Sequence, residues 1–307
     1  RGMIAQVLYN LEDAPEAVIF NDVWTHDVFI QQHPDYTGAK IQIMHNNGEF
    51  GKMLLEAYPH VDRKWLASLE AKIIESSDKI VFVGKKNRER FIEIHPEASE
   101  KAVHVHLGIE PLEDIDEPRE VNHNDVFTFV SVGTVCTRKN QRVLLEIARS
   151  KEIIKPIRFI VVGGGPDLPF CEKLVEKYSL SDCVEFVGPS NDVASYLSQA
   201  DAFISTSYDE GLPTVALEAM SCSLPLVLTD VGGCSELIKG NGVLVSGCSP
   251  ADIVAGINTF LDSFSRGEIS GEASLELFQK HYRTESMCDE YAGLIKGLIE
   301  PHRQPNT

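Results

Sequence analysis

The sequence predicts an α/β protein with two domains, each a parallel sheet covered by helices on both faces. The chain has 307 residues, which exceeds the usual size of one domain. Short apolar segments of strand length alternate with segments of helical periodicity along most of it. Between Glu110 and Asn124 the composition shifts to prolines and carboxylates, which indicates a linker between the two domains.

The first domain opens with a predicted helix over residues 2–11, where apolar residues recur at helical spacing. The strands expected after it are the apolar runs 17–20, 41–44, 79–83 and 102–106. Helices are expected over residues 63–76 and from residue 86. Ligands of parallel sheets bind outside the carboxyl ends of the strands. Three polar residues are expected at those ends: His26, His45 and Asn46.

The second domain continues the same alternation. Its expected strands are 126–132, 157–162, 184–187, 202–205, 226–228 and 243–245. Its expected helices are 141–149, 168–178, 193–198, one that starts at Pro213, a short one that ends near Gly240, 251–264 and 274–281. The last helix, 285–300, carries an apolar stripe typical of core packing, made of Met287, Tyr291, Leu294, Ile295 and Leu298.

The composition is that of an ordinary soluble protein, with 43% hydrophobic and 24% charged residues and no apolar run of membrane-spanning length. A formal net charge of −18 repels nucleic acid and anionic lipid. The seven cysteines are scattered and never form Cys-x-x-Cys, which favours reduced thiols over disulfides or zinc ligation. We therefore expect a cytoplasmic protein without a nucleic-acid partner or an integral membrane segment. Peripheral membrane contact stays open.

The strongest local pattern follows the strand 202–205. Glu210 precedes Pro213, a residue favoured at the first position of a helix. The backbone N–H groups of Leu212 and Thr214 are then expected at the helix start, where unpaired donors and the helix dipole attract phosphate. Glu218 would sit on the second turn. A ligand with phosphates in its middle and hydroxyls at both ends, such as a nucleotide-sugar, suits this arrangement.

Glu210 and Glu218 resemble the E-x7-E motif of GT-B glycosyltransferases, and the flanking residues 211–214 and 217–220 resemble family GT4. The resemblance extends from about Val18 to the last helix and is strongest over residues 129–245. It implies two Rossmann-like domains facing a cleft. It also implies a retaining hexosyltransferase that moves a sugar from a nucleotide-sugar, favoured to be a UDP-sugar, to a hydroxyl acceptor in glycan or glycolipid biosynthesis. The first glutamate is expected to contact the donor sugar and the second the ribose, whereas the spacing alone would more often mark a solvated helix face.

The loop 133–141 resembles the family loop whose Arg and Lys neutralise the donor diphosphate. Lys139 matches the family's Lys, while Thr134 stands at the Arg position and Arg138 is expected to supply that charge. Two cations at the start of a helix are unfavourable against its dipole, so the placement of Arg138 and Lys139 indicates a functional role rather than a structural one. His45 matches a family histidine that contacts the donor sugar beside the reacting carbon. The alternative interpretation is an ordinary hydrogen-bonded histidine without a role in the reaction. The candidate catalytic residues are His45, Lys139 and Glu210.

Backbone segments complete the expected donor site. The glycines at 163–165 permit close approach of a base or phosphate, although a dinucleotide fingerprint is incomplete because Leu168 replaces its third glycine. The family reads its base near the end of the strand 184–187. The expected donor-binding residues are Arg138, Lys139, Gly164, Val187, Asn191, Glu210, Gly211, Leu212, Pro213, Thr214 and Glu218. The nucleotide-sugar would be a substrate, and we expect neither a metal nor another cofactor.

Two further features bear on the assignment. Asp114-Ile-Asp116 has the form of a metal-binding motif of another glycosyltransferase class, but its acidic, proline-flanked context favours a solvated linker.

The strand, glycine-rich loop and helix with which family members begin have no counterpart before Val18. This predicts a partial first domain and a chain that binds nucleotide but transfers sugar poorly.

The predicted organisation is a partial N-terminal domain over residues 1–115, a nucleotide-sugar-binding domain over 116–283, and a helix over 284–307 that crosses back to the first domain. The acceptor, a carbohydrate, lipid or small molecule, stays open. Two alternative functions also stay open: a nucleotide-sugar-binding protein without turnover, and a GT-B isomerase that acts on a UDP-sugar.

Overall fold

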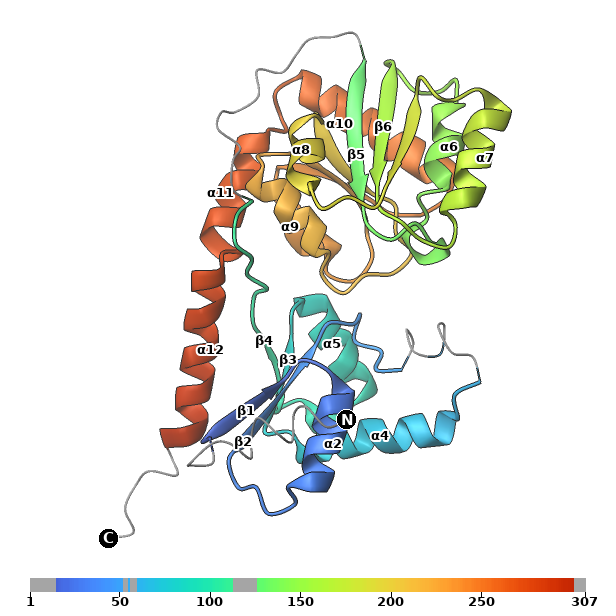
Figure 1. The fold of residues 1–307 in the computed structure, drawn as a ribbon. Helices are drawn as coiled ribbons and strands as arrows, with labels where there is room; N and C mark the ends of the chain where they lie inside the picture. The colour runs from blue at the N-terminus through green and yellow to red at the C-terminus, as the bar shows by residue number, and fades with distance from the viewer. Residues whose placement is uncertain (1–14, 52–54, 56–59, 113–125, 301–307) are drawn as a thin grey trace. The chain divides into compact units, whose positions relative to one another are not determined.

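The computed structural model describes residues 15–51, 55, 60–112 and 126–300. Two compact units are distinguished (Figure 1). Unit 1 takes the chain up to Leu107 and again from Glu285 onward, and unit 2 is Gly108–Thr284. The predicted helix over residues 2–11 and the Asp114-Ile-Asp116 motif lie outside the described residues. Both units contain parallel sheets and helices, which confirms the predicted α/β class.

Unit 1 is built on a parallel sheet with the strand order β1-β2-β3-β4. Its strands are β1 (Ala17–Phe20), β2 (Ala39–Met44), β3 (Lys79–Phe82) and β4 (Ala102–His104). They are connected by α2 (Val23–Gln32), α4 (Arg63–Ser76), α5 (Lys85–Ile94) and the 3-10 turn η1 (Pro96–Ala98). Asp22 and Asp62 start α2 and α4 by accepting hydrogen bonds from backbone N–H groups of the first turn. Because Asp22 is such a cap, α2 begins at Val23, in a segment where no helix was predicted from the sequence.

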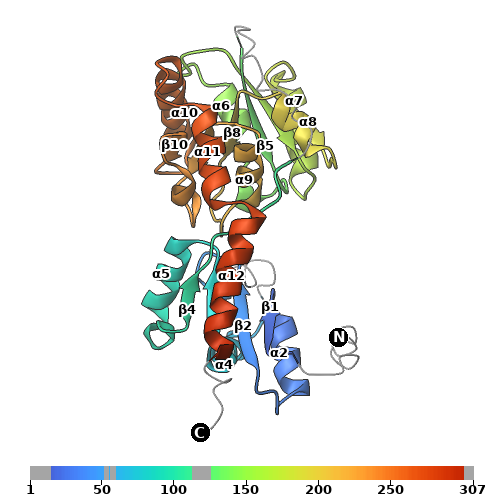
Figure 2. The ribbon, with the colours of Figure 1, turned by 90° about the vertical axis from the view of Figure 1, so that its left-hand side faces the viewer.

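The helix α12 (Thr284–Ile299) packs on the sheet of unit 1 (Figure 2). Its predicted apolar stripe contacts a buried cluster that consists of Ile41, Val81 and Val105. Glu290 on the same helix accepts a hydrogen bond from the backbone N–H of His106 at 3.1 Å and lies 2.7 Å from Nδ1 of its ring. Apolar packing and this polar contact together attach the helix to strands that precede it by more than 180 residues.

Unit 2 contains a parallel sheet with the strand order β10-β9-β8-β5-β6-β7. Its strands are β5 (Phe127–Val132), β6 (Ile157–Val162), β7 (Val184–Gly188), β8 (Ala202–Ser205), β9 (Leu226–Thr229) and β10 (Gly242–Val245). The order reverses between β5 and β8, which pair directly. In doubly wound sheets of this kind, ligands bind outside the carboxyl ends of the strands at the reversal. The loops that follow β5 and β8 are therefore the expected place for a ligand.

Helices cover both faces of this sheet (Figure 1). They are α6 (Val143–Ala148), α7 (Leu168–Tyr178), α8 (Val193–Ser198), α9 (Thr214–Ser221), α10 (Pro250–Ser265) and α11 (Gly271–His281), with the 3-10 turns η2 (Thr137–Lys139) and η3 (Cys234–Leu237). The core joins Phe129 and Phe159 from the strands with Phe260 from α10, all fully buried. The predicted helix 141–149 starts later, because Asn140 adopts a left-handed backbone (φ 54°) between η2 and α6.

All seven cysteines are free thiols. Burial raises the pKa of Cys171 and Cys222 to about 11, so both stay protonated at neutral pH. Within the part of the chain that the structure describes, no helix combines the length and the apolar character needed to cross a bilayer.

Candidate active site

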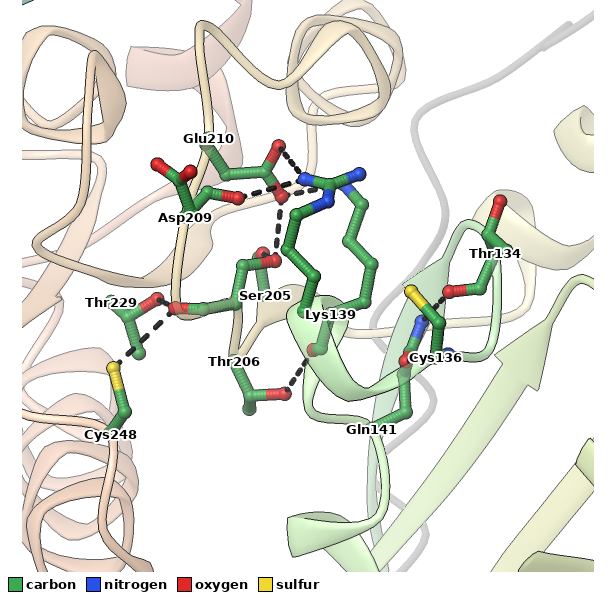
Figure 3. A network of polar contacts seen from close by, with 12 residues as sticks. Thr134, Cys136, Lys139, Gln141, Ser205, Thr206, Asp209, Glu210, Thr229 and Cys248 are labelled. Carbon is green, nitrogen blue, oxygen red and sulfur yellow. Dashed lines mark hydrogen bonds and ion pairs between the residues drawn. The ribbon is translucent and has the colours of Figure 1, made fainter. Parts of the chain in front are cut away.

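The loops after β5 and β8 bring the predicted charged residues together (Figure 3). Nζ of Lys139 lies 2.5 Å from Oε1 of Glu210, and Nη1 of Arg138 lies 3.5 Å from Oε2. Arg138 also donates a hydrogen bond to the carbonyl of Asp209 at 2.8 Å. The side chain of Glu210 is only 7% exposed, compared with 17% for Lys139 and 30% for Arg138. A buried carboxylate thus faces two cations whose outer sides reach solvent.

Buried hydroxyl groups hold this cluster in place. Oγ of Ser207 donates to Oε1 of Glu210 at 2.6 Å. Oγ1 of Thr206 lies 3.2 Å from the carbonyls of both Lys139 and Asn140, and so connects the loop after β8 to the cationic loop. Neither Ser207 nor Thr206 was predicted from the sequence. Hydroxyl residues that directly follow a buried strand and precede a functional carboxylate were the pattern that could have revealed them.

Two glycines, Gly232 and Gly233, pack against the backbone of the Glu210 loop. The N–H of Gly233 donates to the carbonyl of Gly211 at 2.7 Å. Gly232 has a positive φ of 50°, and a β carbon on it would lie 1.8 Å from the carbonyl oxygen of Glu210. A larger residue there would have to displace the loop. Neither glycine was among the residues predicted for the site.

The glycines at 163–165 pack one loop against another. A β carbon on Gly163 would lie 2.0 Å from the carbonyl oxygen of Gly133, and one on Gly165 would lie 2.3 Å from that of Val135. Gly164 was expected near the donor. A β carbon added to it would lie 3.0 Å from Cγ of Pro189. The close approach observed here is between two backbone segments, and a donor contact by Gly164 stays a prediction.

Helix α9 begins one residue later than predicted. Pro213 is the flanking residue, with an extended backbone (φ −72°, ψ 104°), and Thr214 is the first helical residue. Among the side chains that the structure describes, none caps this helix start. Its positive end therefore lies just after the Glu210 loop, with Leu212 buried between them. Glu218, on the second turn, is half-buried, and burial raises the pKa of its carboxyl.

Two predicted base contacts lie further along the same edge of the sheet. Val187 is half-buried in β7, and Asn191 is exposed in the turn that leads to α8. In the sheet, β6 separates β7 from β5. These residues are therefore at the carboxyl edge of the sheet but away from the ion pair, and their contact with a base stays a prediction.

The histidines of unit 1 have different surroundings. His45 is exposed directly after β2, and its Nε2 lies 2.7 Å from Oδ1 of Asn21, which follows β1. Partial burial of the imidazole ring lowers the pKa of His45, although the residue still reaches solvent. His26 was wrongly expected at this edge. It is a core residue of α2, with its ring nitrogens 3.1 Å from Gln42 and 3.2 Å from Ser76.

Among the described residues, no group of three or more His, Cys, Asp or Glu side chains is arranged to hold a metal ion. The positive charge that the site offers to an anion comes from Arg138, Lys139 and the start of α9.

The chain belongs to the glycosyl transferases group 1 family, whose model matches residues 113–268, just over half of the chain. A phosphatidylinositol N-acetylglucosaminyltransferase subunit of Arabidopsis thaliana is 35% identical over 136 residues, which cover 43% of this chain and 30% of that protein. The O-antigen biosynthesis glycosyltransferase WbnH of Escherichia coli is 36% identical over 128 residues, which cover 42% of this chain and 36% of WbnH. The matched segments thus span about a third of these two relatives.

Solved structures resemble the chain over nearly its whole length. HepE of Anabaena, in complex with UDP, has a TM-score of 0.76 at 15% identity, and the match covers 96% of this chain and 82% of HepE. Sucrose-phosphate synthase of Thermosynechococcus elongatus has a TM-score of 0.77 at 21% identity, covering 97% of this chain and 77% of that enzyme. At these identities the likeness shows the fold, and it confirms the predicted GT-B class with two Rossmann-like domains.

Proposed function

We propose that this chain takes part in moving a sugar from a UDP-sugar to a hydroxyl acceptor, with retention of anomeric configuration, in glycan or glycolipid biosynthesis. The observation that carries the proposal is the Lys139–Glu210 pair at the reversal of the unit 2 sheet, beside the start of α9. Family membership supports a transferase. The UDP bound to HepE and the names of the two relatives support the nucleotide and the pathway class.

The donor diphosphate would lie between the cationic loop and the start of α9. Arg138 and Lys139 would face its phosphate oxygens from one side, and the N–H groups at the helix start from the other. These positive groups are in place before the donor arrives, so they can stabilise the charge that develops on the leaving diphosphate. For this reason we propose that transfer needs no added divalent metal.

In the proposed reaction, the bond between the anomeric carbon and the diphosphate oxygen breaks, and its electron pair goes to the diphosphate. The acceptor hydroxyl oxygen forms the new bond to that carbon on the same face, and its proton passes to the departing phosphate. Glu210 would hold hydroxyls of a sugar with oxocarbenium character, and Glu218 would hold the ribose hydroxyls. The role of His45 as a further contact of the donor sugar stays a prediction.

Calorimetric titration with UDP and with UDP-sugars tests the assignment. Glu218→Ala is expected to weaken binding of UDP itself, and Glu210→Ala to spare UDP but remove affinity that the sugar adds. Each loss should be about tenfold to a hundredfold, because a hydrogen bond to a charged group contributes ~1.5–3 kcal/mol. Glu172→Ala, exposed on α7, is the matched control and should change neither affinity.

Two results would contradict the proposal: equal losses of UDP affinity in both variants, and a strict requirement for Mg²⁺ or Mn²⁺. Release of UDP from a bound UDP-sugar distinguishes turnover from binding alone. A protein that binds UDP-sugars tightly but never releases free sugar or a glycosylated product would be a binding protein instead.

A further inference from the structure

We propose that Ser207 is the residue that positions Glu210 for the donor sugar. This inference rests on the proposed function, which assigns the donor sugar to Glu210. Ser207 lies three residues before Glu210, is 1% exposed, and donates a hydrogen bond from Oγ to Oε1 of Glu210 at 2.6 Å. It acts through Glu210, so it is a positioning residue.

Lys139 and Ser207 share the same carboxylate oxygen. Nζ of Lys139 lies 2.5 Å from Oε1 of Glu210. The donor diphosphate would attract the same ammonium, and the flexible four-carbon stem of lysine allows it to turn toward the phosphate. The carboxylate would then lose its nearest cation while it is still buried, which is costly unless another donor remains. Ser207 is that remaining donor on Oε1.

Ser207 is itself held by contacts from the ends of β8 and β9 and from the loop after β10. Oγ1 of Thr229, at the end of β9, donates to the carbonyl of Ser207 at 2.7 Å. The thiol of Cys248, in the loop after β10, lies 3.5 Å from the same oxygen. The hydroxyl of Ser205, at the end of β8, lies 3.2 Å from the hydroxyl of Ser207. These contacts fix the position of Ser207 through the sheet, and none of the three involves Lys139.

The first experiment compares the affinities for UDP and for whichever of UDP-glucose, UDP-galactose and UDP-N-acetylglucosamine the wild type binds best. Ser207→Ala is expected to bind UDP like the wild type. Its ratio of UDP-sugar affinity to UDP affinity should be about tenfold lower, because one hydrogen bond to a charged group is removed. A purely structural defect would weaken both ligands equally, and that result would overturn the proposal.

Ser274→Ala is the matched control. Ser274 is fully buried in α11 of the same unit, and its hydroxyl accepts a hydrogen bond from Nδ2 of Asn241 at 3.0 Å. Its loss removes a buried hydroxyl of unit 2 without touching Glu210. Both affinities should stay at the wild-type value, and a selective loss of the sugar contribution here would also overturn the proposal.

The second experiment needs no ligand. Hydrogen exchange of β5 and β8 gives the stability of unit 2 in Ser207→Ala, Glu210→Ala and the double variant. The two substitutions should be coupled, so that Ser207→Ala destabilises clearly less when Glu210 is already absent. Additive effects would overturn the positioning role. A wild type that binds no UDP-sugar would overturn the proposed function and the sugar role of Glu210, whereas coupling would still support Ser207 as the residue that orients this carboxylate.

Discussion

Replacement of Lys139 by methionine should destabilise unit 2 in the absence of any ligand. The substitution leaves the Glu210 carboxylate, which is 7% exposed, without the cation 2.5 Å away. Removing one partner of a fully buried ion pair costs ~3–5 kcal/mol. Here Arg138 and Ser207 remain within reach of Glu210 and Lys139 is 17% exposed. We therefore expect a smaller cost, about 2 kcal/mol, similar to one hydrogen bond to a charged group.

The assay has to report on unit 2. Both tryptophans of the chain, Trp24 and Trp65, belong to unit 1, so their fluorescence follows the other unit. Hydrogen exchange of β5 and β8 follows unit 2 directly. A loss of about 2 kcal/mol should accelerate exchange of their most protected amides roughly thirtyfold, since 1.4 kcal/mol is a factor of ten.

Two further variants make this measurement specific. Lys173→Met removes an exposed lysine of α7 that does not contact Glu210, and its exchange should match that of the wild type. Lys139→Met should add little when Glu210 is already alanine, because the charge it neutralises is gone. If Lys139→Met exchanges at the wild-type rate, the ion pair does not stabilise unit 2 and the reasoning is refuted.

Two other predictions concern a glycine and a histidine. Gly232→Ala should weaken UDP-sugar binding in calorimetry, because its β carbon would meet the carbonyl of Glu210. Gly240→Ala is the control: its φ is also positive, at 86°, but no atom of the described residues lies within 4 Å of the new carbon, so the affinity should stay unchanged. Unit 1 should lose stability as pH falls from 6.5 toward about 4, because burial lowers the pKa of His26 from 6.5 to about 4 and only the unfolded chain takes up the proton in that window. His104, whose pKa is also lowered to about 4, adds to the same slope. Urea unfolding followed by tryptophan fluorescence measures it, and equal stability across this range would contradict the prediction.

The elements that could be predicted from the sequence are those whose signal lies within a few neighbouring residues. The strand 17–20 and the helix 63–76 have the predicted boundaries, because each follows from an apolar run or a helical repeat within a few residues. Helix α2 was missed although Asp22 is a typical cap, since the polar residues around it also suit a loop. The late start of α6 depends on the left-handed backbone of Asn140, which hydrophobic periodicity does not encode.

The candidate site divides in the same way. The sequence alone determined that Glu210 and Glu218 lie on one loop and the helix after it, and that Arg138 and Lys139 lie on another loop after a buried strand. Only the tertiary structure decided that Lys139 meets Glu210 across 71 residues. It also decided that Thr229, 22 residues after Ser207, donates a hydrogen bond to the serine whose hydroxyl contacts this carboxylate. The physical reason is range: periodicity and capping act over a few residues, whereas these contacts exist because the strand order reverses between β5 and β8 and brings their loops side by side.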